Sequence, residues 1–310
     1  MEKEKRKVNL VGQNTLTISL PSKYVKDNKL EKGDELNCEY EGKDIKFSLT
    51  EFKKQEKSIS INIDNYDALS LSKYITILYI SNYNRIILNY TNSNIDHYRS
   101  NTPKNVKNLI NLYVSRLVGA EIISQTSTKT EIECFLHNDP TELQKIEKRV
   151  YFLFKESANE LIISMKENFN EFQKEVYVHH DNIVKFIFYL LRMIDLSDIS
   201  EYEKKQAYSY FMTIDLLLDK FRHIADEIVK HKYSEKLEKI LKEIFDLFFE
   251  MYSLSFKEKL TKEIIIKRYN LITKIEKEDF NKEELKVLRH ADLFLNFLND
   301  SAYYIASKEV

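Results

Sequence analysis

The sequence predicts a mostly α-helical protein of the α+β class, in which a small N-terminal β region and a short α/β segment precede an antiparallel helical bundle. Three of the four glycines lie in the first fifty residues, where tight turns need them, and residues 143–310 contain neither glycine nor proline. Both residue types break helices, so their absence favours long helices. Apolar residues in this second half recur every three or four positions, which is the period of an amphipathic helix.

Residues 1–50 are predicted to form a strand–strand–helix–strand–strand unit. The first strand turns at residues 12–14 into a second strand, and Pro21 opens a short helix over residues 22–28. A Gly-Asp turn then leads into strands at 36–40 and 44–49. A unit of this size buries too little apolar surface to be stable alone, so we expect it to complete its core with a second copy of the chain.

Residues 51–139 are expected to form a small α/β module. Alternating apolar residues predict strands at 58–63 and 85–90, with a helix at 69–80 between them. A second helix is expected to begin at Pro103 and to stop at Gly119. Strands at 120–125 and 130–136 complete the order β-α-β-α-β-β.

Residues 140–310 are expected to form the helical bundle. The first apolar stripe runs from Leu143 to Met165, and further stripes cover residues 211–228, 237–248 and 285–305. The stretch 183–194 is apolar on nearly all sides. We therefore predict that this stretch belongs to a central, buried helix.

The charge of the chain is low overall but unevenly distributed. The formal net charge is −1, which argues against a polycation built for nucleic acid. Residues 1–32, however, contain eight Lys or Arg against four Asp or Glu, a local net charge of +4 that a dimer would double. The alternative is that these residues form a solvated and inert start of the chain.

No catalytic motif is recognisable in the sequence. A phosphate-binding glycine loop, a GxSxG motif and an HExxH motif are all missing. Cys38 and Cys134 are far apart and indicate neither a disulfide framework nor a zinc ribbon. No apolar segment follows the charged start, and the longest apolar run, residues 186–191, is too short to cross a membrane. We therefore expect a cytoplasmic protein that is not an enzyme and has no membrane span.

The N-terminal unit has a specific order of residues: Arg6-Lys7-Val8, then Gly12, then Thr15-Leu-Thr-Ile-Ser-Leu-Pro21, then Leu30 followed by Gly33-Asp34. This order and spacing resemble the AbrB/SpoVT/MazE family of swapped-hairpin DNA-binding domains. In that family two chains interlock into one small barrel. The resemblance implies a homodimer that binds double-stranded DNA.

The resemblance and the local charge together select six candidate DNA-binding residues: Lys5, Arg6, Lys7, Asn14, Thr15 and Lys23. The basic residues lead directly into the first strand, so a dimer would place two copies of them on one surface, facing the phosphates of a single duplex. Few rigid base-reading groups accompany them. We therefore expect binding that tolerates many sequences.

Four runs in the rest of the chain follow an order like that of a second family. They are residues 71–87, with Asn82 and Asn84 in place of a glycine and an aspartate, Arg116-Leu-Val-Gly-Ala-Glu-Ile-Ile123, Phe188-Tyr-Leu-Leu-Arg192, and His223-Ile-Ala-Asp-Glu227. With the N-terminal unit, they resemble the archaeal-type PhoU-related regulators of phosphate uptake. The resemblance implies a PhoU-like bundle that acts as a sensor or binds a phosphate-signalling protein.

The second resemblance also implies a metal cluster, because the family carries an acidic residue four positions before an aspartate on two helices. The corresponding pairs here are His180 with Val184, Arg222 with Asp226, and Asn296 with Asp300. Each pair lacks at least one carboxylate, and Arg222 is expected to pair with Asp226 and repel a cation. We therefore expect no cofactor, with Asp181, Asp226 and Asp300 as remnants of a site for iron, zinc or manganese.

Two neighbouring groups of residues leave alternatives open. Asp215, Asp219 and Asp226 share a helical stripe that, with Arg222, centres about 135° from the apolar face, which predicts a solvated face or else a relocated metal patch. His179-His180-Asp181 also contains metal-binding residue types. Consecutive residues on a helix point in different directions, however, which disfavours joint ligation of one ion.

Two hypotheses for the function follow. The first is a dimeric DNA-binding transcription regulator related to phosphate uptake, whose bundle is the sensor or partner-binding part. The alternative is an adaptor that does not bind DNA: the hairpins serve only for dimerisation, and the bundle binds a phosphate transporter or a sensor kinase. An antitoxin-like repressor is disfavoured, because the C-terminal part is predicted to be a large folded bundle and not a short disordered tail.

Overall fold

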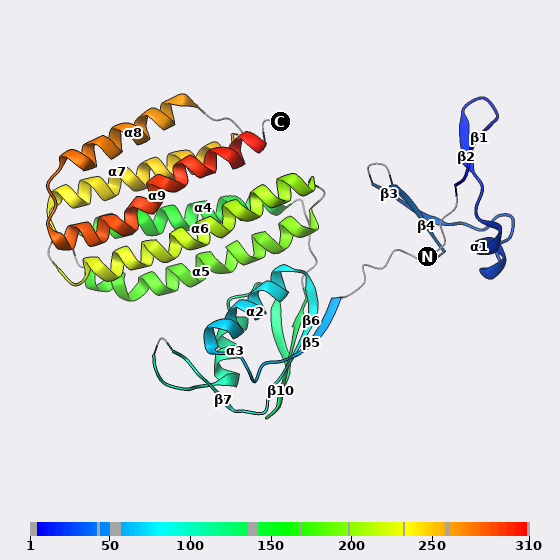
Figure 1. Ribbon diagram of the computed structural model, residues 1–310, viewed down its shortest axis with the longest axis horizontal. Coiled ribbons are helices and arrows are strands. Elements are labelled where there is room, and N and C mark those ends of the chain that lie inside the picture. Colours follow the sequence, from blue (N-terminus) through cyan, green and yellow to red (C-terminus); the bar gives the residue numbers. More distant parts are fainter. Residues whose placement is uncertain are drawn as a thin grey trace. The chain divides into compact units, whose positions relative to one another are not determined.

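The computed structural model describes residues 5–41, 44–49, 57–98, 100–135, 142–167, 169–197, 199–231, 233–257 and 261–308. The chain divides into two compact units, unit 1 (residues 1–55) and unit 2 (residues 56–310). Unit 2 contains both the predicted α/β module and the predicted bundle (Figure 1). The prediction of a mostly helical α+β protein with a small N-terminal β region is confirmed.

Unit 1 consists of two β-hairpins and one short helix. Strand β1 (Val8–Val11) pairs with β2 (Thr15–Ile18), and β3 (Asn37–Glu41) pairs with β4 (Asp44–Ser48). Helix α1 (Ser22–Asp27) lies between the hairpins in sequence and begins directly after a proline, as predicted. The two hairpins belong to separate two-stranded sheets.

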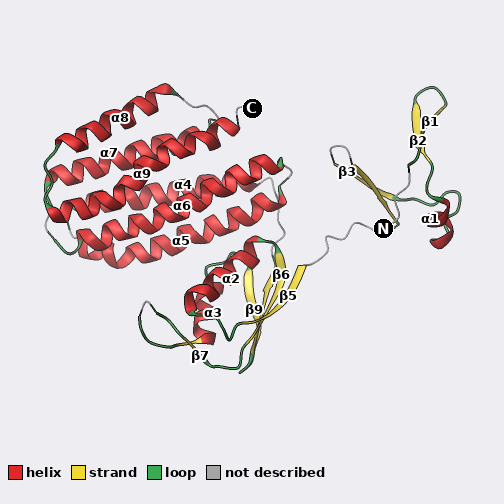
Figure 2. Cartoon of the chain, in the orientation of Figure 1, coloured by secondary structure: helices red, strands yellow, loops and turns green. Residues whose placement is uncertain are grey.

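The α/β module of unit 2 is a four-stranded sheet covered by two helices. Its main elements in chain order are β5 (Lys57–Asn62), α2 (Ala68–Ile80), β6 (Tyr83–Asn89), α3 (Val106–Val114), β9 (Ala120–Gln125) and β10 (Lys129–Cys134). The strand order is β5-β6-β10-β9, with β5 parallel to β6 and the other neighbours antiparallel (Figure 2). The predicted order β-α-β-α-β-β is therefore confirmed for these elements.

The second helix of the module begins later than we predicted. Two short strands, β7 (Asn94–Ile95) and β8 (Lys104–Asn105), pair with each other, and β8 occupies the first positions that we assigned to the helix. The side chain of Asn105 then accepts a hydrogen bond from the backbone N–H of Asn108 at 3.2 Å. An asparagine N-cap therefore starts α3, and not Pro103.

The bundle contains six helices in the described part of unit 2: α4 (Leu143–Ser164), α5 (Phe169–Leu196), α6 (Glu201–Ile228), α7 (Glu235–Leu254), α8 (Lys262–Lys277) and α9 (Lys282–Ser307). Helices α4, α5, α6, α9 and α7 pack in a closed ring in that order, and α8 packs against α7 and α9. Capping boxes at Ser200 and Asn281 fix the starts of α6 and α9. No helix in these residue ranges is long and apolar enough to cross a membrane.

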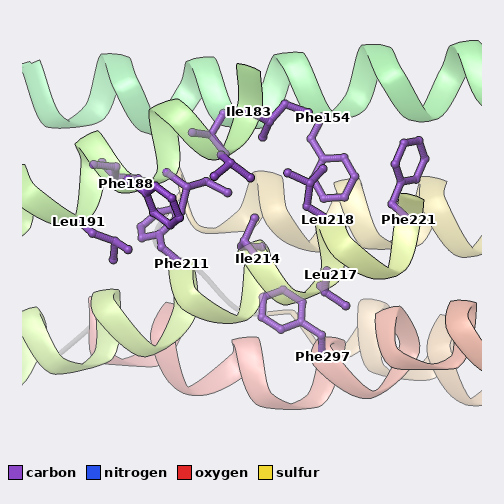
Figure 3. Close-up of a cluster of buried hydrophobic side chains, with 14 of the residues drawn as sticks. Phe154, Ile183, Phe188, Leu191, Phe211, Ile214, Leu217, Leu218, Phe221 and Phe297 are labelled. Carbon is purple, nitrogen blue, oxygen red and sulfur yellow. The ribbon is translucent and has the colours of Figure 1, made fainter. Parts of the chain in front are cut away.

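Aromatic side chains fill the centre of the ring. The Phe154 ring of α4 meets the rings of Phe221, Phe248 and Phe249 edge to face, with centroids 5.5, 5.6 and 5.5 Å apart. Figure 3 shows Phe154 beside Ile183 of α5 and Leu218 of α6. Such contacts stabilise a core beyond the burial of area alone. The predicted buried stretch 183–194 is confirmed, since it supplies most of the buried residues of α5.

A buried arginine joins the α/β module to the bundle. Arg192 of α5 is 1% exposed, donates a hydrogen bond to the Tyr79 carbonyl at 2.5 Å, and lies 4.8 Å from the centroid of the Tyr79 ring. This carbonyl belongs to the last turn of α2, where a cation is favourable. Asn82, at φ +61°, donates to the Asp195 carboxylate at 2.6 Å. Asparagine tolerates this left-handed conformation better than most residues other than glycine.

Candidate functional site

The first hairpin of unit 1 presents an apolar face to solvent. Its register pairs Val8 with Ile18 and Leu10 with Leu16, and these four side chains lie on one face because alternate residues of a strand point the same way. Leu10 is 63% exposed and Leu16 is 68% exposed. Large apolar residues in such a cluster indicate a surface that another element covers.

The second hairpin repeats this arrangement. Its register pairs Cys38 with Phe47 and Tyr40 with Ile45, which again places four apolar or aromatic side chains on one face. All four are exposed, and Tyr40 is 80% exposed. No described residue of unit 1 is buried. A unit with two exposed apolar faces lacks a core of its own, so it needs a further surface to be stable.

The hairpin register divides the six candidate DNA-binding residues into two groups. The first group is Lys5, Arg6 and Lys7, which directly precede Val8 of β1. Val8 pairs with Ile18, and Lys23 of α1 follows Ile18 closely in sequence. Asn14, in the turn, and Thr15, the first residue of β2, are at the other end of the same hairpin. Three residue steps along a strand separate the two ends by about 10 Å. In one chain, therefore, the basic group and the turn group lie at opposite ends of the hairpin.

The structure does not bring Asp181, Asp226 and Asp300 together. Asp181 forms an ion pair with Arg116 at 2.8 Å, and Asp226 accepts a hydrogen bond from the Tyr177 hydroxyl at 3.0 Å, whereas Asp300 is exposed on α9. Among the described residues, no three His, Cys, Asp or Glu side chains could hold a metal ion together. These residues therefore do not fit the iron, zinc or manganese site that the resemblance implies.

The predicted ion pair between Arg222 and Asp226 is wrong. The Arg222 Nη2 group instead lies 3.2 Å from Asp219 Oδ1, one turn earlier on α6, and its guanidinium lies 5.2 Å from the centroid of the Tyr177 ring on α5. Tyr177 in turn holds Asp226. The reason is the hydroxyl of Tyr177 on α5, which donates a hydrogen bond to Asp226, so this carboxylate has a partner other than Arg222.

The carboxylate stripe of α6 is also not the solvated face that we expected. Asp215 and Asp219 are half-buried, and Arg222 is buried. They line a cleft of about 710 Å³ between α2 and α3 of the module and α5 and α6 of the bundle. The stripe faces away from the core of the ring, but the α/β module packs beside it. The periodicity of apolar residues within one helix cannot predict this packing.

A chain of charged contacts crosses this cleft. It begins with Arg116 after α3, which pairs with Asp181 of α5. His180 contacts Asp181 through Nδ1 and Asp219 of α6 through Nε2, both at 3.2 Å, and Asp219 pairs with Arg222. The adjacent His179 turns towards α4, where Nδ1 lies 3.2 Å from the Ser157 hydroxyl. The two consecutive histidines thus point in different directions, as expected on a helix.

The charged contacts change the pKa values of the groups in the chain. Burial alone would lower the pKa of His180, but the hydrogen bonds with Asp181 and Asp219 outweigh it and leave the pKa raised. The hydrogen bond from His180 is the largest cause that lowers the pKa of Asp219 to about 2. Burial raises the pKa of Asp215, which outweighs the opposite effect of Lys73.

We expect the raised pKa of His180 to make stability fall at mildly alkaline pH. In the unfolded chain His180 has the ordinary histidine pKa of 6.5, so protonated His180 stabilises the fold fully below that pH. The contribution disappears as the pH rises through the higher pKa of the folded state. Urea denaturation between pH 6 and 9 should show this decrease, and His180→Gln should remove that part of it. Equal pH profiles for the two proteins would contradict the expectation.

Sequence reasoning missed Arg116, Lys73 and Arg192 as residues that shape this region. Arg116 and Arg192 lie in runs that we quoted only for their resemblance, and Lys73 lies on α2 in the 71–87 run. No spacing rule connects residues on α2, α3 and α5, since their proximity comes from packing.

Comparison with known proteins adds no relative. No family model, no curated protein and no solved structure matches this chain.

Proposed function

We propose that the chain is a DNA-binding transcription regulator that acts as a homodimer, with unit 1 as the dimerisation and DNA-binding part. The observation that supports this most is the pair of exposed apolar faces on the two hairpins of unit 1. Two copies of the chain can cover these faces mutually, as in a swapped-hairpin barrel. An identical partner is always available, and two-fold symmetric association is the commonest form of oligomer.

The basic residues of unit 1 support DNA as the ligand of this dimer. Lys5 and Lys7 are exposed immediately before β1, and Lys23 is exposed on α1. Dimerisation would double the number of cations in one assembly. Phosphate contacts of this kind provide most of the affinity of sequence-tolerant DNA binding. Unit 2, a helical bundle with an attached α/β module, would then be the PhoU-like sensor or partner-binding part, with a role in phosphate uptake.

We expect the double substitution Arg6→Ala, Lys7→Ala to weaken DNA binding and to reduce its salt dependence. Each phosphate contact contributes about 0.9 to the slope of log K against log salt, so a dimer that loses two contacts per chain should lose roughly 3 to 4. Fluorescence anisotropy with a random-sequence duplex, at salt concentrations from about 50 to 200 mM, measures both the affinity and its dependence on salt.

The matched control is Lys26→Ala, Lys32→Ala. It removes the same charge from exposed positions of unit 1 that we do not assign to DNA contact. The control should change the slope much less. If the wild-type protein is a dimer but does not bind DNA, or if both double variants behave alike, the DNA-binding proposal fails. The alternative then stands, in which the hairpins serve only for dimerisation and the bundle binds a phosphate transporter or a sensor kinase.

A further inference from the structure

The cleft of unit 2 has two compartments that share a wall. The polar compartment, of about 710 Å³, contains the chain of charged contacts. The apolar compartment, of about 290 Å³, is lined mainly by apolar and aromatic side chains, among them Ile77, Tyr208 and Met212. Lys73 and Asp215 line both compartments, and so does Phe188. The volumes are those of ordinary small-molecule sites.

Most charged side chains of the polar compartment already have partners within the protein. Asp67 caps α2 by accepting from the N–H of Ser70 at 3.0 Å. The remaining partnered groups are Arg116 with Asp181, Arg222 with Asp219, His180 with both aspartates, and His97 with Ser100. Within the described ranges, this leaves Lys73 and Asp215 as the charged lining residues that make no hydrogen bond or ion pair.

We propose that the cleft binds a small zwitterionic molecule with an apolar body, namely an α-amino acid with an aliphatic or aromatic side chain. Its carboxylate pairs with Lys73, its ammonium group pairs with Asp215, and its side chain enters the apolar compartment. Both charged groups lie at the boundary between the compartments, so the charged end and the apolar end of one molecule meet matching surfaces. The inference concerns unit 2 and does not depend on DNA binding by unit 1.

Charge balance favours a zwitterion over a simple anion. The charge of the exposed Lys73 partly offsets that of the half-buried Asp215, so an anion that paired with Lys73 alone would take this compensation away from Asp215. A zwitterion supplies a new cation to Asp215 at the same time as it pairs with Lys73. Burial raises the pKa of Asp215, which is the expected effect when a carboxylate lacks hydrogen-bond donors. An ammonium group at hydrogen-bond distance would reverse this effect, because an opposite charge favours the ionised form.

Isothermal titration calorimetry of the full-length protein with L-leucine, L-methionine and L-phenylalanine tests the site. We expect saturable binding of at least one of them. 4-Methylpentanoate lacks the ammonium group of leucine, and 3-methylbutylamine lacks its carboxylate. Each should bind at least tenfold more weakly than leucine, and glycine should bind more weakly because it has no apolar side chain.

Two substitutions locate the binding. Asp215→Asn and Lys73→Gln keep the size of the side chains and should each weaken binding of the best amino acid by tenfold or more. Asp300→Asn, at an exposed position of α9, should leave it unchanged. Circular dichroism spectra of the variants check that each is folded like the wild type. The proposal is overturned if none of the three amino acids binds at 10 mM, roughly the weak limit for such sites, if leucine and its singly charged analogues bind equally, or if the folded cleft variants bind like the wild type.

Discussion

The double substitution Leu10→Asp, Leu16→Asp is expected to convert the protein from a dimer into monomers. The two leucines are cross-strand partners and are 63% and 68% exposed in the single chain, so a swapped-hairpin dimer would bury four such side chains. Each buried leucine contributes about 1.5 kcal/mol or more, which makes the loss at least about 6 kcal/mol for the dimer. This corresponds to a dissociation constant raised by roughly ten-thousandfold.

Analytical ultracentrifugation measures the change directly. The wild-type protein should sediment with twice the chain mass of 37.0 kDa, and the variant should sediment as single chains. Asn9→Asp, Thr17→Asp is the matched control, because this cross-strand pair lies on the other face of the same hairpin. The control should remain a dimer. A wild-type monomer at micromolar concentration, or a dimer of the leucine variant, would exclude association through this face.

Arg192→Met is expected to be the most destabilising single substitution at the joint between module and bundle. It keeps an unbranched apolar stem but removes the guanidinium that donates to the Tyr79 carbonyl. Hydrogen bonds from charged donors contribute about 1.5–3 kcal/mol to stability. Because Arg192 is only 1% exposed, the Tyr79 carbonyl would lose this donor in a buried site. We therefore expect the free energy of unfolding to fall by about 2–4 kcal/mol.

Arg149→Met is the control for this prediction. Arg149 also stacks on an aromatic ring, with its guanidinium 4.5 Å from the centroid of the Phe186 ring, but it is exposed. Its replacement should cost less than about 0.5 kcal/mol, which is usual for surface positions. Urea denaturation followed by circular dichroism gives both values. Equal losses for the two variants would show that burial and the carbonyl contact are not what make Arg192 important.

The order and type of most elements could be predicted from the sequence because their signals are local. Glycine and proline mark the turns of unit 1, and their absence after residue 142 marks the long helices. The start of α3 differs from the prediction because the short β7–β8 pairing joins residues nine and eleven positions apart, and a proline alone does not mark a helix start. Helix α8, residues 262–277, was not among the stripes that we identified.

The candidate cleft could not be predicted in the same way. Asp215, Asp219 and Arg222 are visible as a stripe on one helix, but the residues that face them come from α2, α3 and α5. Helical periodicity shows which side of a helix faces away from its main core. It does not show that a second layer packs over part of that side, which is how an apparently solvated stripe became the wall of a cleft.

The contact between Arg192 and Tyr79 has a consequence for co-translational folding. The two residues are 113 positions apart, so α2 leaves the ribosome long before the arginine that binds its last turn is made. At typical rates of translation this delay is about 6 to 23 seconds. During that interval the nascent α/β module lacks its buried cation and the helix beneath it. The module should therefore become resistant to protease only after α5 has been synthesised.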